Sequence, residues 1–252
     1  MKFTELGLSP NILEGIHRLG FETPTPVQSE VIPVILEDTR DVVALAQTGT
    51  ANTAAFGLPL LQMLTPKSPI PQALVLCPTR ELCMQITRDL QSYATALPGV
   101  RVLAVYGGAD IRPQLSALER GVQVVVATPG RMLDILRRER VDFSQIERVV
   151  LDEADEMLNM GFVEDLESIL STVPDAARTL LFSATMPREV AQIAKKYMQE
   201  PVEITVGNRN AGAENVNHEY YVVHARDRYD ALRRIVDVYP RMYGIVFCRT
   251  RL

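Results

Sequence analysis

The sequence predicts an α/β protein in which a parallel sheet is covered by helices on both faces. Short runs rich in Val, Ile and Leu alternate with longer segments whose apolar residues recur at helical spacing. Several of the short runs are apolar throughout, which is typical of strands buried on both faces of a parallel sheet. The 252 residues, 47% of them hydrophobic, suffice for one large domain or for one domain with part of another.

Apolar runs in the first 206 residues are the expected strands. They cover residues 42–45, 73–77, 100–106, 122–127, 148–151, 179–182 and 202–206. The expected helices lie between them, at residues 28–37, 54–63, 81–94, 111–119, 131–138, 163–171 and 188–199. In the segment 81–94, Leu82, Ile86 and Leu90 recur at the spacing of one helix face.

The segment 207–215 is polar and rich in small residues, so we expect a linker there. Beyond it, residues 219–224 and 244–248 are expected strands and residues 227–239 an expected helix. The segment 216–252 is shorter than the roughly 40 residues below which a domain needs extra help to fold. We therefore expect it to be the start of a second domain, poorly ordered or paired with another chain through its strand edges.

The composition argues against membrane-spanning, secreted and disulfide-rich classes of protein. No apolar run approaches the roughly 18 residues of a membrane span, and the first residues lack the apolar core of a signal peptide. The three cysteines are too few and too scattered for a disulfide framework or a zinc site, so a cytoplasmic protein without a membrane partner is expected. A net charge of −5 argues against strong non-specific nucleic-acid binding by this chain alone, although it allows a local basic groove.

Residues 46–53 lie between an expected strand and an expected helix, where a phosphate-binding loop belongs. Such a loop usually ends in Gly-Lys-Thr or Gly-Lys-Ser. This chain has Ala51, Asn52 and Thr53 instead. Two residues that the loop most needs are therefore replaced.

Polar side chains also follow two other expected strands. Asp152, Glu153 and Asp155 come after one strand, at the sheet edge where ligands bind. In nucleotide hydrolases an Asp at this place holds Mg²⁺, and the carboxylate that follows it can polarise the attacking water. The alternative is an acidic turn that caps the next helix. Ser183 and Thr185 follow another strand and could bond these carboxylates, or else cap a helix N-terminus.

Four further segments have both a functional and an ordinary interpretation. In residues 21–28, an aromatic ring and an amide could stack on and bond an adenine, or could simply start a Pro-rich helix beside a core Phe. The segments 78–82, 107–108 and 128–131 each follow a strand. Their backbone amides, Thr and Arg side chains suit phosphate contacts, but ordinary turns and helix caps use the same residues.

Together and in this order, these segments resemble the N-terminal RecA-like domain of a DEAD-box ATP-dependent RNA helicase, which has a P-loop NTPase fold. The resemblance covers residues 1–206, with the Q-motif at about 1–29, and residues 216–252 resemble the start of the second RecA-like domain. Residues 246–250 are similar to the family's motif IV. The resemblance implies ATP and Mg²⁺ as cofactors, the second RecA-like domain as a partner, and RNA unwinding through backbone contacts with little sequence preference.

The resemblance also implies residue roles. Phe21 would stack on adenine and Gln28 would read its amino edge; Glu153 would orient the attacking water. The implied nucleotide-binding residues are Phe21, Thr23, Gln28, Thr48, Gly49, Thr50, Ala51, Asn52 and Thr53. The implied catalytic residues are Asp152, Glu153, Ser183 and Thr185, of which the last two couple nucleotide state to RNA, and Thr53 and Asp152 would hold Mg²⁺ mostly through water. The implied RNA-binding residues are Pro78, Thr79, Arg80, Gly107, Gly108, Thr128, Gly130 and Arg131.

The chain departs from the family at positions 51 and 52. The missing lysine would offset transition-state charge, and losing one such group lowers the rate by about 10²–10³. If position 51 needs a positive φ, Ala costs roughly 1–2 kcal/mol; otherwise its methyl could crowd the phosphate. Because Ala favours helix, the following helix could also begin earlier and partly close the loop.

These departures lead to a prediction and leave alternatives. The arginines that sense the γ-phosphate in this family lie beyond residue 252, so we expect this polypeptide alone neither to hydrolyse ATP nor to unwind RNA. It is then a disabled helicase, a pseudo-helicase that binds RNA or a partner without turnover, or a protein-interaction scaffold. The intact segments 152–155 and 183–185 favour the first interpretation.

Overall fold

The computed structural model describes residues 1–46, 50–66, 68–138, 142–207, 219–239 and 241–248. The chain divides into two compact units, Met1–Ala211 and Gly212–Leu252. This boundary falls inside the predicted linker, of which residues 208–215 lie outside the described residues. The domain limits 1–206 and 216–252 stay a prediction.

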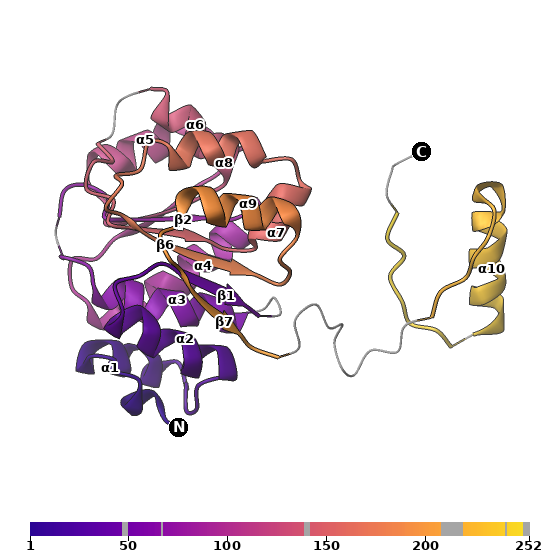
Figure 1. Ribbon diagram of the computed structural model, residues 1–252, viewed down its shortest axis with the longest axis horizontal. Helices are drawn as coiled ribbons and strands as arrows, with labels where there is room; N and C mark the ends of the chain where they lie inside the picture. The colour runs from indigo at the N-terminus through magenta and orange to yellow at the C-terminus, as the bar shows by residue number, and fades with distance from the viewer. Residues whose placement is uncertain (47–49, 67, 139–141, 208–218, 240, 249–252) are drawn as a thin grey trace. The chain divides into compact units, whose positions relative to one another are not determined.

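The first unit is built on one seven-stranded sheet in which every strand pair is parallel (Figure 1). Its strand order is β3-β4-β2-β5-β6-β1-β7. The strands are β1 (Val42–Leu45), β2 (Ala73–Leu76), β3 (Val102–Val105), β4 (Val124–Ala127), β5 (Arg148–Leu151), β6 (Arg178–Ser183) and β7 (Val202–Thr205). All lie at the predicted positions, and the predicted fold class is confirmed.

Helices cover both faces of the sheet (Figure 1). One layer holds α1 (Pro10–Arg18), α2 (Pro26–Glu37), α3 (Thr50–Gln62) and α4 (Arg80–Tyr93). The other holds α5 (Ile111–Glu119), α6 (Pro129–Leu136), α7 (Ala154–Asn159), α8 (Val163–Leu170) and α9 (Arg188–Tyr197). Short 3₁₀ turns, η1 (Phe3–Glu5) and η2 (Ala94–Ala96), precede α1 and follow α4.

Alternation along the strands divides the core between the two layers. In β1, Val42 and Ala44 pack with the α1–α4 layer, whereas Val43 and Leu45 pack with the other layer. Successive side chains of a strand point to opposite faces, so a strand between two helical layers must be apolar at every position. This explains the continuous apolar runs from which the strands were predicted.

Helix α3 is the central helix of its layer. Phe56 and Leu60 lie on one face of it and Leu58 on the opposite face, and all three are fully buried. The ring of Phe56 meets that of Phe182 in β6 edge-on at 5.2 Å. A helix that is apolar all round is a buried helix. Each of these large side chains contributes about 1.5–3 kcal/mol to the free energy of unfolding, so α3 is firmly anchored at the sheet edge where its N-terminus lies.

Two helices were not predicted. Helix α7 is the short helix that follows the acidic segment, and α1 begins at Pro10 after Ser9 and buries Ile12 and Ile16, one turn apart. Gly15 of α1 packs against the backbone carbonyl of Tyr93, where a Cβ atom would collide with the oxygen. The absence of a side chain at Gly15 therefore allows α1 to support the end of α4.

A buried carboxylate joins three elements beside β1. Asp41 accepts hydrogen bonds from the backbone nitrogen of Thr179 at 2.7 Å and from that of Gln199 at 2.6 Å. These bonds connect the start of β1 to β6 and to the turn between α9 and β7. Buried polar groups without such partners are costly, so Asp41 fixes the register of this part of the sheet.

The second unit has one α-helix in its described residues, α10 (Arg228–Val238), preceded by a 3₁₀ turn (Ala225–Asp227). The strands predicted at 219–224 and 244–248 are wrong, because neither segment is a strand here. A strand needs a neighbour to pair its backbone groups, and these segments have none among the described residues. Val222 and Phe247 are consequently 91% and 90% exposed. No helix in the described part of the chain combines the length and apolar character needed to cross a membrane.

Candidate functional site

The carboxyl ends of all seven parallel strands lie at one edge of the sheet, and the predicted site residues other than Phe21, Thr23 and Gln28 lie at the ends of six of them. The strand order separates these residues into two groups. The segments after β5, β6 and β1 are adjacent and contain the predicted phosphate loop and carboxylates. The segments after β3, β4 and β2 are also adjacent and contain the predicted RNA contacts. This is the edge at which α/β proteins bind ligands.

The phosphate-loop segment begins after β1. Thr48 and Gly49 lie outside the described residues, and α3 starts at Thr50. The helix thus begins four residues before residue 54, where the sequence pattern placed its start. Ala51 lies inside the helix with a right-handed backbone, so of the two possible costs at this position, positive-φ strain does not apply.

Positions 52 and 53 lie in the first turn of α3, and both residues are buried, at 4% and 2% exposure. The first backbone N–H groups of a helix have no intrahelical acceptor and favour an anion. The helix end therefore retains its attraction for phosphate. Asn52 adds an amide to this site but no positive charge.

Asp152 follows β5, and its backbone nitrogen donates to the carbonyl of Leu76 in β2 at 2.9 Å. The carboxyl is buried, and one of its oxygens accepts a hydrogen bond from the backbone nitrogen of Glu153 at 3.1 Å. Burial, followed by the nearby charge of Glu153, raises the pKa of Asp152 to about 7. A cation near this carboxylate would offset that cost, as expected of a metal ligand.

Glu153 has a left-handed backbone, with φ of 51° and ψ of 51°. A non-glycine residue adopts this conformation at a cost that is commonly found at functional sites. The turn starts α7 immediately after the strand and leaves the Glu153 side chain half-buried beside Asp152. Burial, together with the charges of Glu156 and Asp155, raises the pKa of Glu153.

A hydrogen-bond network joins the segments after β5 and β6. Thr185 donates to one carboxylate oxygen of Asp155 from its hydroxyl at 2.7 Å and from its backbone nitrogen at 2.9 Å. The hydroxyl of Ser183 donates to the carbonyl of Thr185 at 2.7 Å and accepts from the backbone nitrogen of Asp155 at 3.3 Å. The bond expected between a hydroxyl and a carboxylate is confirmed for Thr185, whereas Ser183 bonds backbone groups.

The alternative interpretation of this segment as a side-chain cap is not observed, because the residue that caps α9 is Pro187. Asp155 is the centre of the network, yet sequence reasoning gave it no role of its own. Its position three residues after Asp152, in the first turn of the helix, was the only available signal.

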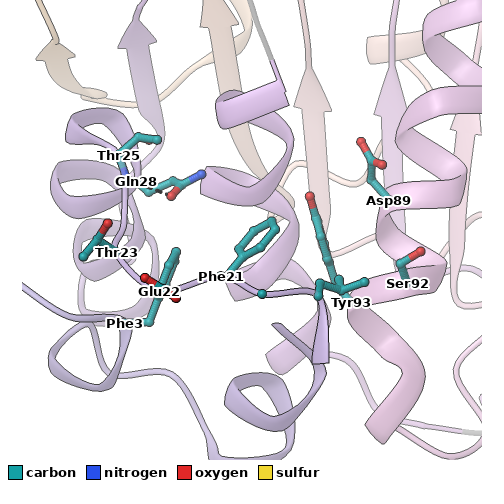
Figure 2. Close-up of a pocket in the computed structure, with 11 residues that line it drawn as sticks. Phe3, Phe21, Glu22, Thr23, Thr25, Gln28, Asp89, Ser92 and Tyr93 are labelled. Atoms are coloured by element: carbon teal, nitrogen blue, oxygen red, sulfur yellow. Dashed lines mark hydrogen bonds between the residues drawn. The ribbon is translucent and has the colours of Figure 1, made fainter. Parts of the chain in front are cut away.

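A cavity of about 640 Å³ lies beside α2 and α4 (Figure 2). It is lined by Phe3, Leu19, Gly20, Phe21, Glu22, Thr23, Thr25, Gln28, Asp89, Ser92 and Tyr93. Phe21, Thr23 and Gln28 were predicted nucleotide contacts, and the structure brings all three to this cavity. Glu22 and Thr25 belong to the predicted segment 21–28, whereas Asp89, Ser92 and Tyr93 come from α4 and were not predicted.

Aromatic rings and one amide give the cavity its form. The ring of Phe21 lies 5.9 Å from that of Phe3 and meets that of Tyr93 edge-on at 5.8 Å, measured between centroids. The Oε1 atom of Gln28 accepts a hydrogen bond from the backbone nitrogen of Thr25 at 2.9 Å. This bond also caps α2, so the segment both starts a helix and lines the cavity. The predicted adenine contacts stay predictions.

The second group of loops exposes three glycines and Arg80. Arg80, Gly107, Gly108 and Gly130 are exposed, Thr79, Thr128 and Arg131 are half-buried, and Pro78 is buried. The Thr79 hydroxyl accepts from the backbone nitrogen of Leu82 at 3.2 Å and so caps α4. Arg131 donates from Nη2 to the carbonyl of Ala109 at 2.9 Å, which ties the start of α6 to the loop after β3. These segments therefore form one connected surface.

Oxygen donors dominate the candidate metal position. Thr53 offers a hydroxyl and Asp152 a carboxylate, both of which suit Mg²⁺, an ion that keeps several water ligands in proteins. Within the described ranges, no three His, Cys, Asp or Glu side chains cluster as a metal site. The residues thus fit a magnesium ion held through few protein ligands.

Comparison with known proteins matches residues 25–193 to the model of the DEAD/DEAH box helicase family. The chain is similar to the DEAD-box ATP-dependent RNA helicase CshA of Geobacillus kaustophilus, with 45% identity over 99% of this chain and 53% of that protein. It is also similar to the ATP-dependent RNA helicase DeaD of Escherichia coli K12, with 44% identity over 99% of this chain and 39% of that protein.

A solved structure is also similar to this chain. A DEAD box protein from the hyperthermophile Methanococcus jannaschii superposes with a TM-score of 0.78 at 41% identity, over 99% of this chain and 67% of that one. The chain spans about half the length of the curated relatives it matches.

Proposed function

The chain belongs to the DEAD/DEAH box helicase family, and from this premise we propose that it is the ATP-binding and RNA-binding RecA-like half of an ATP-dependent RNA helicase. The observation that carries the proposal is the arrangement of the sheet edge. Loops suited to a nucleotide follow β5, β6 and β1, loops suited to RNA phosphates follow β3, β4 and β2, and all open on the same side. We propose that residues 216–252 begin the second RecA-like domain, the partner of the first.

In this proposal the cavity beside α2 takes the adenine. Phe21 stacks on the base and Gln28, whose amide is oriented by its bond to Thr25, reads the amino edge. The phosphates lie at the N-terminus of α3, where helix amides attract anions. Mg²⁺ supplies electrostatic stabilisation of the phosphates when bound, near Thr53 and Asp152. Glu153 follows Asp152 in the chain and has a raised pKa. In this proposal its carboxylate holds the attacking water.

The network of Asp155, Ser183 and Thr185 connects the carboxylates to the strand next to the phosphate loop. We propose that it transmits nucleotide state to the RNA surface. On that surface, contacts to phosphate and sugar rather than to base edges give binding with little sequence preference.

The same proposal assigns this chain a weakened phosphate site. Asn52 cannot supply the charge of the family's lysine, so ATP affinity and turnover are both reduced, the rate by about 10²–10³ or more. ADP and AMP lose less than ATP, since the lysine acts mainly on the outer phosphates. The pair Asp155–Thr185 remains intact, which favours a disabled helicase over a scaffold.

The test is a pair of titrations with the chain as it stands. A fluorescent ADP analogue with Mg²⁺ should bind weakly, and a labelled single-stranded oligouridylate should bind with an affinity that falls as salt rises. Replacing Arg80 by Ala should weaken RNA binding, whereas replacing Arg18, an exposed arginine of α1 paired with Glu14, should not. Binding of neither ligand would favour the scaffold interpretation and overturn the proposal.

A further inference from the structure

Arg80 has an unusual setting among the arginines of this chain. It is exposed at the start of α4, and its Cζ atom lies 4.8 Å from the centre of the Tyr106 ring. Within the described residues no carboxylate oxygen lies within 4.0 Å of it, whereas Arg40 and Arg112 are each paired with an aspartate. Among the described residues its guanidinium therefore faces an aromatic ring and not a carboxylate.

Tyr106 is held firmly enough to act as a support. The buried side chain of Gln114 accepts from the backbone nitrogen of Tyr106 at 3.3 Å and donates to its carbonyl at 3.2 Å. The same amide donates to the carbonyl of Asp110 at 3.4 Å. One side chain of α5 thus satisfies both backbone groups of the residue that follows β3 and holds the backbone from which the Tyr106 ring extends.

The glycine loop passes beside this pair. Gly108, with φ of 75°, needs the left-handed conformation that glycine adopts most easily, and a Cβ atom there would lie 3.8 Å from Nη1 of Arg80. On its other side the loop is tied to Arg131 through Ala109. Backbone amides and a guanidinium are therefore presented together at one place on the surface.

We propose that Tyr106 is a positioning residue of the RNA-binding surface, whose ring holds the Arg80 guanidinium so that its edge meets an RNA phosphate. The inference rests on the proposed function. A stacked guanidinium uses its face for the ring and keeps its N–H groups in the plane for a two-pronged bond to phosphate oxygens. A free arginine would have to be ordered on binding, and stacking reduces that entropic cost.

The proposal is tested by a double-mutant cycle on binding of labelled oligouridylate, measured by fluorescence anisotropy at low salt. An exposed cation–π contact corresponds to a change of about 2- to 5-fold. Tyr106→Leu should weaken RNA binding by this factor, and Tyr106→Phe, which keeps the ring, should bind nearly as well as the unsubstituted chain. In the absence of the Arg80 guanidinium, Tyr106→Leu should have no further effect. The proposal would be overturned if the losses of RNA affinity of the two single variants multiplied in the double variant. It would also be overturned if Tyr106→Leu and Tyr106→Phe lost equal affinity.

A second measurement separates this inference from the proposed function. In ¹H–¹⁵N spectra the Arg80 Nε–H resonance, assigned by its loss in Arg80→Ala, should carry a ring-current shift that Tyr106→Leu removes and Tyr106→Phe retains. No shift in the unsubstituted chain would overturn the positioning role even if RNA binds. A shift with no RNA binding would overturn the proposed function, and with it the role in RNA binding, while the stacked geometry stood.

Discussion

The buried carboxyl of Asp152 should make the stability of the chain depend on pH. Its pKa rises from 3.8 to about 7 on folding, mainly through burial. The rise is about three pH units, and at about 1.4 kcal/mol per unit it corresponds to about 4 kcal/mol in the free energy of unfolding. Relaxation around the charged group makes this an upper value.

The direction of this pH dependence depends on whether the folded or the unfolded state holds the proton. Below pH 3.8 the carboxyl is protonated in both states and its contribution to stability is fully present. Between pH 3.8 and about 7 the unfolded state loses the proton while the folded state keeps it, so stability falls as pH rises. Above about pH 7 both states are ionised and the loss is complete.

Asp152→Asn isolates this effect, because the amide keeps an oxygen to accept the bond from Glu153 and cannot ionise. Urea unfolding of both proteins at pH 4.5 and at pH 7.5, without Mg²⁺ or nucleotide, measures it. From pH 4.5 to pH 7.5, the free energy of unfolding of the variant should rise by about 2–4 kcal/mol relative to that of the original chain. An equal difference in unfolding free energy at both pH values would refute the raised pKa.

Substitutions at Gly15, Asp41 and Thr185, each with a matched control, test the packing and the hydrogen-bond network. Gly15→Ala, which places a methyl against a backbone carbonyl, should lower the free energy of unfolding by about 1–3 kcal/mol. Gly57→Ala meets the end of the Leu90 side chain and touches the Tyr93 ring at an ordinary contact distance, so it should change that free energy by less than about 1 kcal/mol. Urea titration distinguishes the two. Asp41→Ala leaves two buried N–H groups without their acceptor and should lower the free energy of unfolding by about 2–5 kcal/mol in the same assay. Asp41→Asn should be intermediate. A loss under about 1 kcal/mol for Asp41→Ala would be inconsistent with this role. Thr185→Val removes the hydroxyl bond to Asp155 and should lower the free energy of unfolding by about 1–2 kcal/mol. Thr185→Ser keeps a hydroxyl and should retain most of the stability of the original chain. Equal stability of the Val and Ser variants would argue against the bond.

Much of the fold was predictable because its signals are local. The strands lie between two helical layers, so segments such as 124–127 are apolar throughout and are followed by a polar residue. The second unit shows where this reasoning fails. Segments 219–224 and 244–248 have the β-branched and aromatic residues of strands, but strand formation depends on a neighbour to pair with, which composition does not report.

The site was predictable in part. The positions of Asp152 and the phosphate loop follow from chain order alone, since parallel strands end at one edge. The role of Asp155 as the acceptor for Thr185 depends on β5 and β6 being neighbours, which sequence did not reveal. Tyr93 reaches the cavity because α1 packs against its backbone through Gly15, a tertiary contact without a local signal.

The central claim is that the phosphate site is weakened by the residue at position 52. Calorimetric titration of ADP–Mg²⁺ and ATP–Mg²⁺ into the chain, into Asn52→Lys, and into Asn52→Lys with Ala51→Gly tests it most directly. A charge-assisted contact of about 1.5–3 kcal/mol predicts roughly 10- to 100-fold tighter ATP binding once lysine is present. Because Ala51 has an ordinary helical backbone, the single substitution should give most of that gain. ATP binding of equal strength in all three proteins would contradict the account.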